Sequence, residues 1–145
     1  MKNWLVILFT LVYTDIYAQG DAIIGVWFTE ENKGMVEFFK REGKYFGKII
    51  WLKEPNDEET GKPHVDENNP EERLQSRPII GMEVMLDFVY DAEDEAWTDG
   101  TAYDPESGDS YSCKITMSDD NTLRVRGYIG FTLIGRTDIW KRKAF

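Results

Sequence analysis

The sequence has one cysteine and one histidine in 145 residues, which limits the chemistry available to it. An intramolecular disulfide is impossible, even if the chain is exported to an oxidising compartment. The single thiol, Cys113, belongs to a row of apolar residues at every second position from Tyr111 to Met117. We therefore expect a buried, unreactive thiol and not a nucleophile.

The single histidine is a weak indication of a metal site. The residues that follow His64 include several acidic ones: Asp66, Glu67, Glu71 and Glu72. Zinc sites usually need more His or Cys ligands than this chain has, and these carboxylates lack the spacing and the glycine of a calcium loop. We interpret the stretch as a solvated acidic loop, and we expect no metal and no cofactor.

Positive charge is also scarce. The chain has 17 Lys and Arg against 27 Asp and Glu, so its net charge is -10. Phosphate backbones would be repelled, which argues against nucleic acid as a partner. Beyond the N-terminal stretch, no apolar run is long enough to span a bilayer, so we expect no stable membrane insertion of the mature chain.

The N-terminal stretch has the features of a secretory signal peptide. Lys2 supplies a basic start, residues 4–13 are nearly all apolar, and Ala18 is a small residue suited to cleavage. We expect residues 1–18 to be removed and residues 19–145 to form one exported domain, periplasmic or extracellular. The alternative is a short membrane anchor, but the run falls short of the ~20 residues that span a bilayer.

Apolar residues alternate with period two from Ile23 to the end of the chain, which predicts an all-β domain. Residues 53–77, between the third and fourth strands, are polar, and Asn69-Pro70 followed by Glu71 indicates a short helix there. Strands in the first half are apolar on both faces, which favours a closed antiparallel up-and-down barrel with this segment folded over it. The eight predicted strands are residues 23–29, 34–40, 44–52, 80–88, 95–103, 109–117, 122–128 and 131–142.

Turn chemistry predicts the register of two hairpins. A two-residue Glu42-Gly43 loop sets Glu37 opposite Lys48, with two apolar pairs on the same face, Met35 with Ile50 and Phe39 with Phe46. We expect a sheltered ion pair, in which loss of one partner costs roughly 3 to 5 kcal/mol. The alternative is that these charges contact a ligand.

A four-residue loop at 105–108 sets Asp99 opposite Lys114 in the next hairpin. This register places Trp97 and Tyr103 on the polar face with Asp99. We expect them to lie beneath the 53–77 segment, and the alternative is that they line a rim of the barrel. The other face pairs small residues with large ones, as suits the interior of a small barrel; these are Ala96, Gly100 and Ala102 against Tyr111, Cys113, Ile115 and Met117.

Several motifs in order resemble one bacterial family: GVWFT at 25–29, GKIIWLKEP at 47–55, GKP at 61–63, Asn69-Pro70, Arg77-Pro78, VRGY at 125–128 and GRT at 135–137. The chain resembles the secreted family catalogued as domain of unknown function 2147 over nearly all of its mature length. This resemblance implies a calycin-like barrel, export and no established activity. The GxW at 25–27 is also similar to the opening of lipocalins, in which a cation of the last strand stacks on the Trp. Arg136 is the cation we favour, and Arg142 is the alternative.

We expect a binding module, not an enzyme, because no nucleophile elbow, glycine-rich phosphate loop or Cys/His dyad is present. A small apolar or amphipathic ligand would enter the barrel mouth or interior. One alternative is an enzyme that uses carboxylates such as Glu37 and Asp99 on an envelope or extracellular substrate. Another is a structural or protein-interaction barrel with a filled interior. No catalytic residue is predicted; the candidate ligand-binding residues are Glu37, Lys48, Trp51, Arg77, Arg126 and Arg136.

Overall fold

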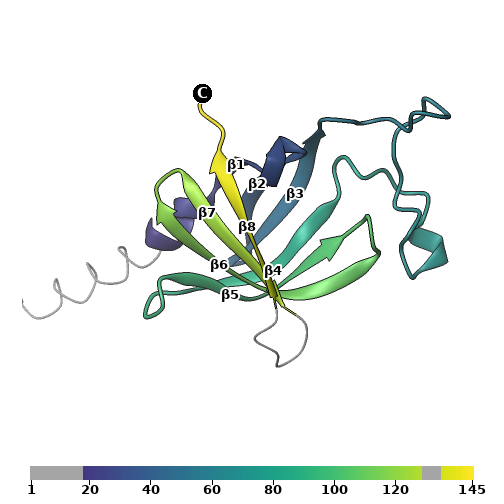
Figure 1. The fold of residues 1–145 in the computed structure, drawn as a ribbon. Coiled ribbons are helices and arrows are strands. Elements are labelled where there is room, and N and C mark those ends of the chain that lie inside the picture. The colour runs from purple at the N-terminus through teal and green to yellow at the C-terminus, as the bar shows by residue number, and fades with distance from the viewer. Residues whose placement is uncertain (1–17, 129–134) are drawn as a thin grey trace, which may run out of the picture.

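The protein is a closed barrel of antiparallel strands in sequence order, β1 to β8 (Figure 1). The computed structural model describes residues 18–128 and 135–145. The predicted all-β, up-and-down, eight-stranded barrel is confirmed. Its strands are β1 (Gly25–Phe28), β2 (Gly34–Arg41), β3 (Lys44–Leu52), β4 (Glu83–Asp91), β5 (Ala96–Asp104), β6 (Asp109–Asp119), β7 (Thr122–Tyr128) and β8 (Gly135–Arg142), and its 3-10 helices are η1 (Asp21–Ile23), η2 (Glu30–Asn32) and η3 (Glu72–Leu74).

Two sequence predictions fall on residues that the structure does not describe. The predicted signal peptide, residues 1–18, lies outside the described residues except for Ala18, and so do the first residues predicted for the last strand, 131–134. The short helix predicted after Asn69-Pro70 is present as the single 3-10 turn η3. In the described part of the chain, no helix is long and apolar enough to cross a membrane.

The β2–β3 hairpin follows the predicted register near its turn and departs from it at the far end. Glu42 and Gly43 both have positive φ, 51° and 78°, as a two-residue hairpin turn of this hand requires. Glu37 pairs with Lys48, and Phe39 with Phe46, as predicted. Met35 was expected opposite Ile50 but pairs with Trp51, because a bulge between Met35 and Val36 adds one residue to β3.

A bulge also corrects the β5–β6 register. Gly100 pairs with Cys113 as predicted, but the pairing is irregular between Trp97 and Gly100, where Asp99 has a φ of 60°. The bulge reverses which face the earlier residues occupy, since side-chain direction alternates with every residue. Trp97 therefore lies in the core at 2% exposure and not on the polar face. Lys114, expected opposite Asp99, forms its ion pair with Asp94.

The barrel interior is filled by the protein's own side chains. An added Cβ at Gly100 would lie 2.4 Å from the Phe88 ring, so the ring occupies the space that a side chain would need. Gly47 is similarly close to Val36 and Met85. Packing of this density is typical of a solid core. Its largest fully buried side chains include Trp27, Phe38, Phe88 and Trp97.

The N-terminal segment closes one end of the barrel. The Trp27 indole donates a hydrogen bond to the Ile23 carbonyl at 2.9 Å, and the Trp97 indole donates one to the Gly20 carbonyl at 3.0 Å. The Arg142 guanidinium lies 4.1 Å from the centre of the Trp27 ring. The preference for Arg136 as this cation is wrong, because Trp27 pairs directly with Arg142 in the β1–β8 ladder, whereas Arg136 lies near the other end of β8.

Cys113 is expected to be inert in the folded protein. It is 1% exposed, and burial raises the pKa of its thiol to about 12, so almost no thiolate exists at pH 8. Ellman's reagent at pH 8 should leave the native protein unlabelled and react fully after unfolding in guanidinium chloride, which serves as the control. Rapid labelling of the native protein would show that the apolar row from Tyr111 to Met117 is open to solvent.

Candidate functional site

The segment between β3 and β4, residues 53–82, lies at the end of the barrel that also holds the β5–β6 turn (Figure 1). We call it the β3–β4 segment. Asn68 attaches it to that turn, because its amide donates to the Glu106 carbonyl at 2.9 Å. Gly108, with a φ of 76°, permits this close approach, since a Cβ there would lie 2.0 Å from the Asn68 carbonyl oxygen. The glycine therefore allows the segment to dock.

A buried carboxylate connects the segment to the barrel wall. The Asp66 side chain is 0% exposed and accepts hydrogen bonds from three groups: Tyr103 Oη at 2.5 Å, Asn69 Nδ2 at 2.8 Å, and Arg77 Nη2 at 3.0 Å. Burial, together with the bond to Asp66, raises the pKa of Tyr103 to about 12, so the phenol stays protonated and donates. The solvated loop predicted around His64 is therefore wrong at Asp66, where these donors replace water.

An open cleft of about 680 Å³ lies between this segment and the outer face of the barrel. Leu86 forms part of its floor; it pairs with Thr101, which is exposed, while the adjacent Met85 is in the core. Tyr103 and Ser110, paired across β5 and β6, extend the same outer surface. The remaining lining comes from the segment and the start of β4, and comprises Asn69, Pro70, Glu71, Arg77, Pro78, Ile80, Gly81, Met82 and Glu83.

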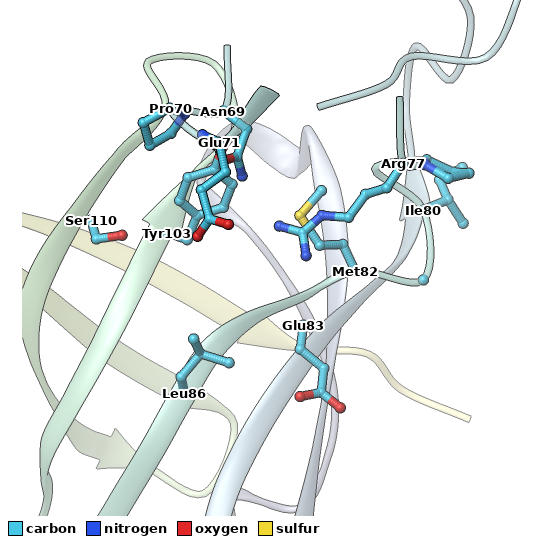
Figure 2. Close-up of a pocket in the computed structure, with 12 residues that line it drawn as sticks. Asn69, Pro70, Glu71, Arg77, Ile80, Met82, Glu83, Leu86, Tyr103 and Ser110 are labelled. Carbon is cyan, nitrogen blue, oxygen red and sulfur yellow. Dashed lines mark hydrogen bonds between the residues drawn. The ribbon is translucent and has the colours of Figure 1, made fainter. Parts of the chain in front are cut away.

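One cation in the cleft is held in a fixed position and still has a donor available. Figure 2 shows the Arg77 side chain pointing into the cleft, toward Tyr103 and Glu71. Its Nε and Nη2 both bind Asp66, whereas Nη1 makes no hydrogen bond within the described part of the chain. A guanidinium offers donors on all three nitrogens in a planar fork, so this arrangement leaves one edge for an incoming acceptor.

The two carboxylates in the cleft lining are paired with other arginines. Glu83 accepts from both terminal nitrogens of Arg41, at 2.8 and 3.1 Å, and these bonds lower the pKa of Glu83. Glu71 forms an exposed pair with Arg73 at 2.6 Å. The apolar side chains of Ile80, Met82 and Leu86 also line the cleft, so it combines an apolar surface with an anchored cation.

Of the predicted ligand-binding residues, only Arg77 lies in this cleft. Glu37 and Lys48 lie on the outer face of β2 and β3, because Val36 and Phe38 on either side of Glu37 are core residues. Trp51, partly exposed, packs edge-on against Phe28 on the outside of the barrel. Arg126 lines a separate hollow on β6, β7 and β8, and Arg136 pairs with Glu30 and Asp138. The structure therefore distributes the predicted residues over several surfaces.

The apolar outer face near Glu37 is not covered by the β3–β4 segment. Phe39 and Phe46 stack with ring centres 5.9 Å apart, and the Arg41 guanidinium lies 4.1 Å from the centre of the Phe46 ring. An arginine can cover aromatic surface while its charged end stays in water. The expected covering by residues 53–77 is therefore wrong here, since Arg41 performs that role.

Lys48→Met is expected to lower the free energy of unfolding by no more than about 1 kcal/mol. The Lys48 and Glu37 side chains are each 41% exposed and 3.5 Å apart, so water solvates Glu37 when its partner is removed. The sheltered pair predicted from the sequence is wrong, because the face it occupies borders solvent. Urea unfolding of the single and double variants with Glu37→Leu measures the effect, and a loss of ~3 kcal/mol would show a sheltered pair.

The structure does not bring together the residues of the alternative carboxylate site or of the metal site considered near His64. Glu37 on β2 and Asp99 on β5 are separated in the barrel by β3 and β4. Among the residues that the structure describes, no three His, Cys, Asp or Glu side chains are grouped to hold a metal ion. Sequence reasoning missed Met82 and Leu86 as cleft residues, because apolar positions in a strand indicate burial and do not distinguish a core from a groove.

Comparisons with known proteins agree with this fold. The family model described as "Uncharacterized protein conserved in bacteria (DUF2147)" matches residues 25–142. The chain belongs to the DUF2147 family. The resemblance identified from the sequence motifs is thereby confirmed, and the match spans all eight strands of this DUF2147 barrel.

A solved structure extends the comparison from sequence to fold. It is a protein from the human pathogen Helicobacter pylori described as belonging to the lipocalin family. It is 24% identical to this chain, with a TM-score of 0.70 over 84% of this chain and 83% of the other. This likeness shows that the DUF2147 chain has a lipocalin-like barrel. The comparison with curated proteins returns no match.

Proposed function

We propose that the protein is an exported binding module for a small amphipathic molecule with an acidic group, and that the cleft beneath the β3–β4 segment is its binding site. The observation that carries the proposal is the Arg77 guanidinium, held by a fully buried carboxylate and directed into a cleft with an apolar floor. An acidic group would contact Arg77 Nη1, and the apolar part would lie on Leu86, beside the largely buried Met82.

The size and composition of the cleft support a small-molecule ligand. Its volume of about 680 Å³ falls within the roughly 300–1,000 Å³ typical of such sites. These sites usually combine apolar lining with a few fixed polar groups, which here are Arg77 and Tyr103. Because side chains fill the interior, we place the ligand on the outer surface. The sequence had led us to expect it in the barrel mouth or interior.

Export is the second part of the proposal, and it rests on the N-terminal sequence. A basic residue, an apolar run and Ala18 precede η1 and the first strand of the barrel. N-terminal sequencing of the protein recovered from outside the cytoplasm should return a chain that starts near Gln19. Recovery of an intact Met1 on the exported form would contradict the proposed cleavage.

Binding of 11-(dansylamino)undecanoic acid, a fluorescent amphipathic carboxylate, tests the cleft directly. Leu86→Asp places a charge on the apolar floor and should weaken binding by at least about tenfold, since one desolvated charge costs more than 1.4 kcal/mol. Val89→Asp is the matched control, because Val89 is also on β4, is 39% exposed and lies outside the cleft. It should bind like the parent. No binding by the parent, or equal affinities of the two variants, would overturn the proposal.

A further inference from the structure

A second hollow lies on the outer face of β6, β7 and β8, away from the cleft that holds Arg77. Its volume is about 140 Å³, and five of the residues that the structure describes line it: Lys114, Thr116, Arg124, Arg126 and Thr137. Three of the five are cations and the other two carry hydroxyl groups, so each of these five side chains can donate a hydrogen bond. No carboxylate is among them, although Asp and Glu outnumber Lys and Arg by 27 to 17 in the chain.

The strand registers bring these cations together. Lys114 is directly opposite Arg126 across β6 and β7, and Arg124 is two residues from Arg126 on the same strand and face. Thr116 is opposite Arg124, and Thr137 is opposite Arg126 on the other side. Like charges directly opposite each other on neighbouring strands destabilise a sheet, so this arrangement has a cost in the folded protein.

Two of these cations have partners of their own, whereas Arg124 has no acidic partner in the described part of the chain. Lys114 reaches Asp94 at 3.6 Å, and Arg126 Nη1 donates to Thr137 Oγ1 at 3.2 Å. Arg124 forms no ion pair with any residue that the structure describes, and its side chain is exposed. Elsewhere on the barrel, cations on the outer face are matched across strands by acids, as in Lys48 with Glu37 and Arg41 with Glu83.

We propose that this hollow binds a phosphate-type oxyanion. Two guanidinium groups and an ammonium around a small space would neutralise an anion with more than one charge and supply charge-assisted hydrogen bonds to several of its oxygens. The two threonine hydroxyls add neutral donors. Bound anion would also relieve the repulsion between Lys114, Arg124 and Arg126, so occupancy stabilises the fold.

The acidic character of the whole protein does not prevent this. Charges separated by more than a Debye length, about 10 Å at 0.1 M salt, are largely screened, so the local field near the hollow is set by its three cations and by Asp94, which pairs with Lys114. The net charge of -10 instead opposes long polyanions that would extend over the acidic remainder of the surface. The favoured anion is therefore small, either free or as one headgroup of a lipid.

Isothermal titration of the full mature chain with inorganic phosphate, at ionic strength held constant with sodium chloride, tests the proposal. Arg124→Gln should weaken phosphate binding about tenfold or more, because loss of one hydrogen bond to a charged group raises a dissociation constant by at least about that factor. Arg73→Gln is the matched control: it removes the same charge from an exposed arginine outside the hollow and should leave the affinity unchanged. Equal affinities of the two variants would overturn the site. That result is also the one expected if phosphate binds at Arg77 and not in this hollow.

Stability measurements separate a ligand site from a structural role. Phosphate should raise the melting temperature of the parent and of Arg73→Gln but not that of Arg124→Gln. Without phosphate, Arg124→Gln should be at least as stable as the parent, because it removes repulsion; a clear loss of stability would indicate a structural arginine and contradict the proposal.

Cosedimentation with phosphatidylglycerol vesicles, against phosphatidylcholine vesicles, identifies the source of the anion. Binding of these vesicles that is lost in Arg124→Gln assigns a lipid headgroup, and phosphate binding without vesicle binding assigns a free anion. Binding of neither phosphate nor phosphatidylglycerol overturns the inference.

Discussion

Arg77→Met is expected to lower the free energy of unfolding by about 3 to 5 kcal/mol, because it leaves a buried carboxylate without its cation. The Asp66 side chain is 0% exposed, and Arg77 provides its only ion pair among the described residues. Tyr103 and Asn69 still donate to Asp66 in the variant, but neutral donors do not balance its charge. The same substitution should abolish binding of the dansyl probe in the cleft.

Arg41→Met is the control for this prediction within the same chain. Arg41 makes two hydrogen bonds to Glu83, at 2.8 and 3.1 Å, so the pair has better geometry than that of Arg77 with Asp66. Both partners are partly exposed, however, and the expected loss is about 1 kcal/mol or less. Urea unfolding monitored by tryptophan fluorescence compares the two. Similar losses for both would show that burial of Asp66 does not decide the stability of its pair.

A third variant tests the mechanism of that loss. Asp66→Asn combined with Arg77→Met removes the charge that Arg77→Met leaves unpaired, while an amide oxygen still accepts from Tyr103. The double variant should therefore be more stable than Arg77→Met alone, which is a coupling that a double-mutant cycle measures directly. Strict additivity of the two single losses would mean that the two side chains do not interact in solution.

The fold could be predicted from the sequence wherever local turn chemistry sets the register. The Glu42-Gly43 turn has few conformations available, so the pairing of Glu37 with Lys48 followed from counting residues. The bulges near Met35 and Asp99 could not be predicted in this way, because a bulge arises from packing between strands and has no distinctive local pattern. Because the second bulge was not foreseen, Trp97 was predicted on the outer face and not in the core.

The candidate site was harder to predict because it depends on contacts between distant parts of the chain. Tyr103 and Asp66 are 37 residues apart, and nothing in the sequence around either one indicates the other. The stacking of a cation on Trp27 was expected from the family resemblance. The choice between Arg136 and Arg142 depended on the register of β8 and on which of its side chains face the interior. Residues 129–134, which connect it to β7, lie outside the described part of the chain.

Gly100→Ala is expected to destabilise the protein by roughly 1 to 3 kcal/mol through overpacking of the barrel interior. The added methyl group would lie 2.4 to 2.5 Å from three atoms of the Phe88 ring, which is itself fully buried. An aromatic ring cannot move aside like the flexible end of a long side chain, so the ring and the strand must shift together. This result would support an interior without room for a ligand, on which the assignment of binding to the outer cleft depends.

Gly127→Ala is a closely matched control, because Gly100 and Gly127 flank Cys113 on its two neighbouring strands and face the same interior. Among the described residues, a Cβ at Gly127 would meet only the Tyr111 Cβ, at an ordinary 3.7 Å, and φ there is not positive. The substitution should be neutral or stabilise by up to about 1 kcal/mol, since alanine restricts the unfolded chain. In the Gly100→Ala background, Phe88→Leu should recover part of the loss by removing the ring atoms that clash. If Gly100→Ala and Gly127→Ala have equal stability, or if Phe88→Leu only adds its own loss, the interior has free volume beside Phe88, and a ligand inside the barrel becomes the better hypothesis.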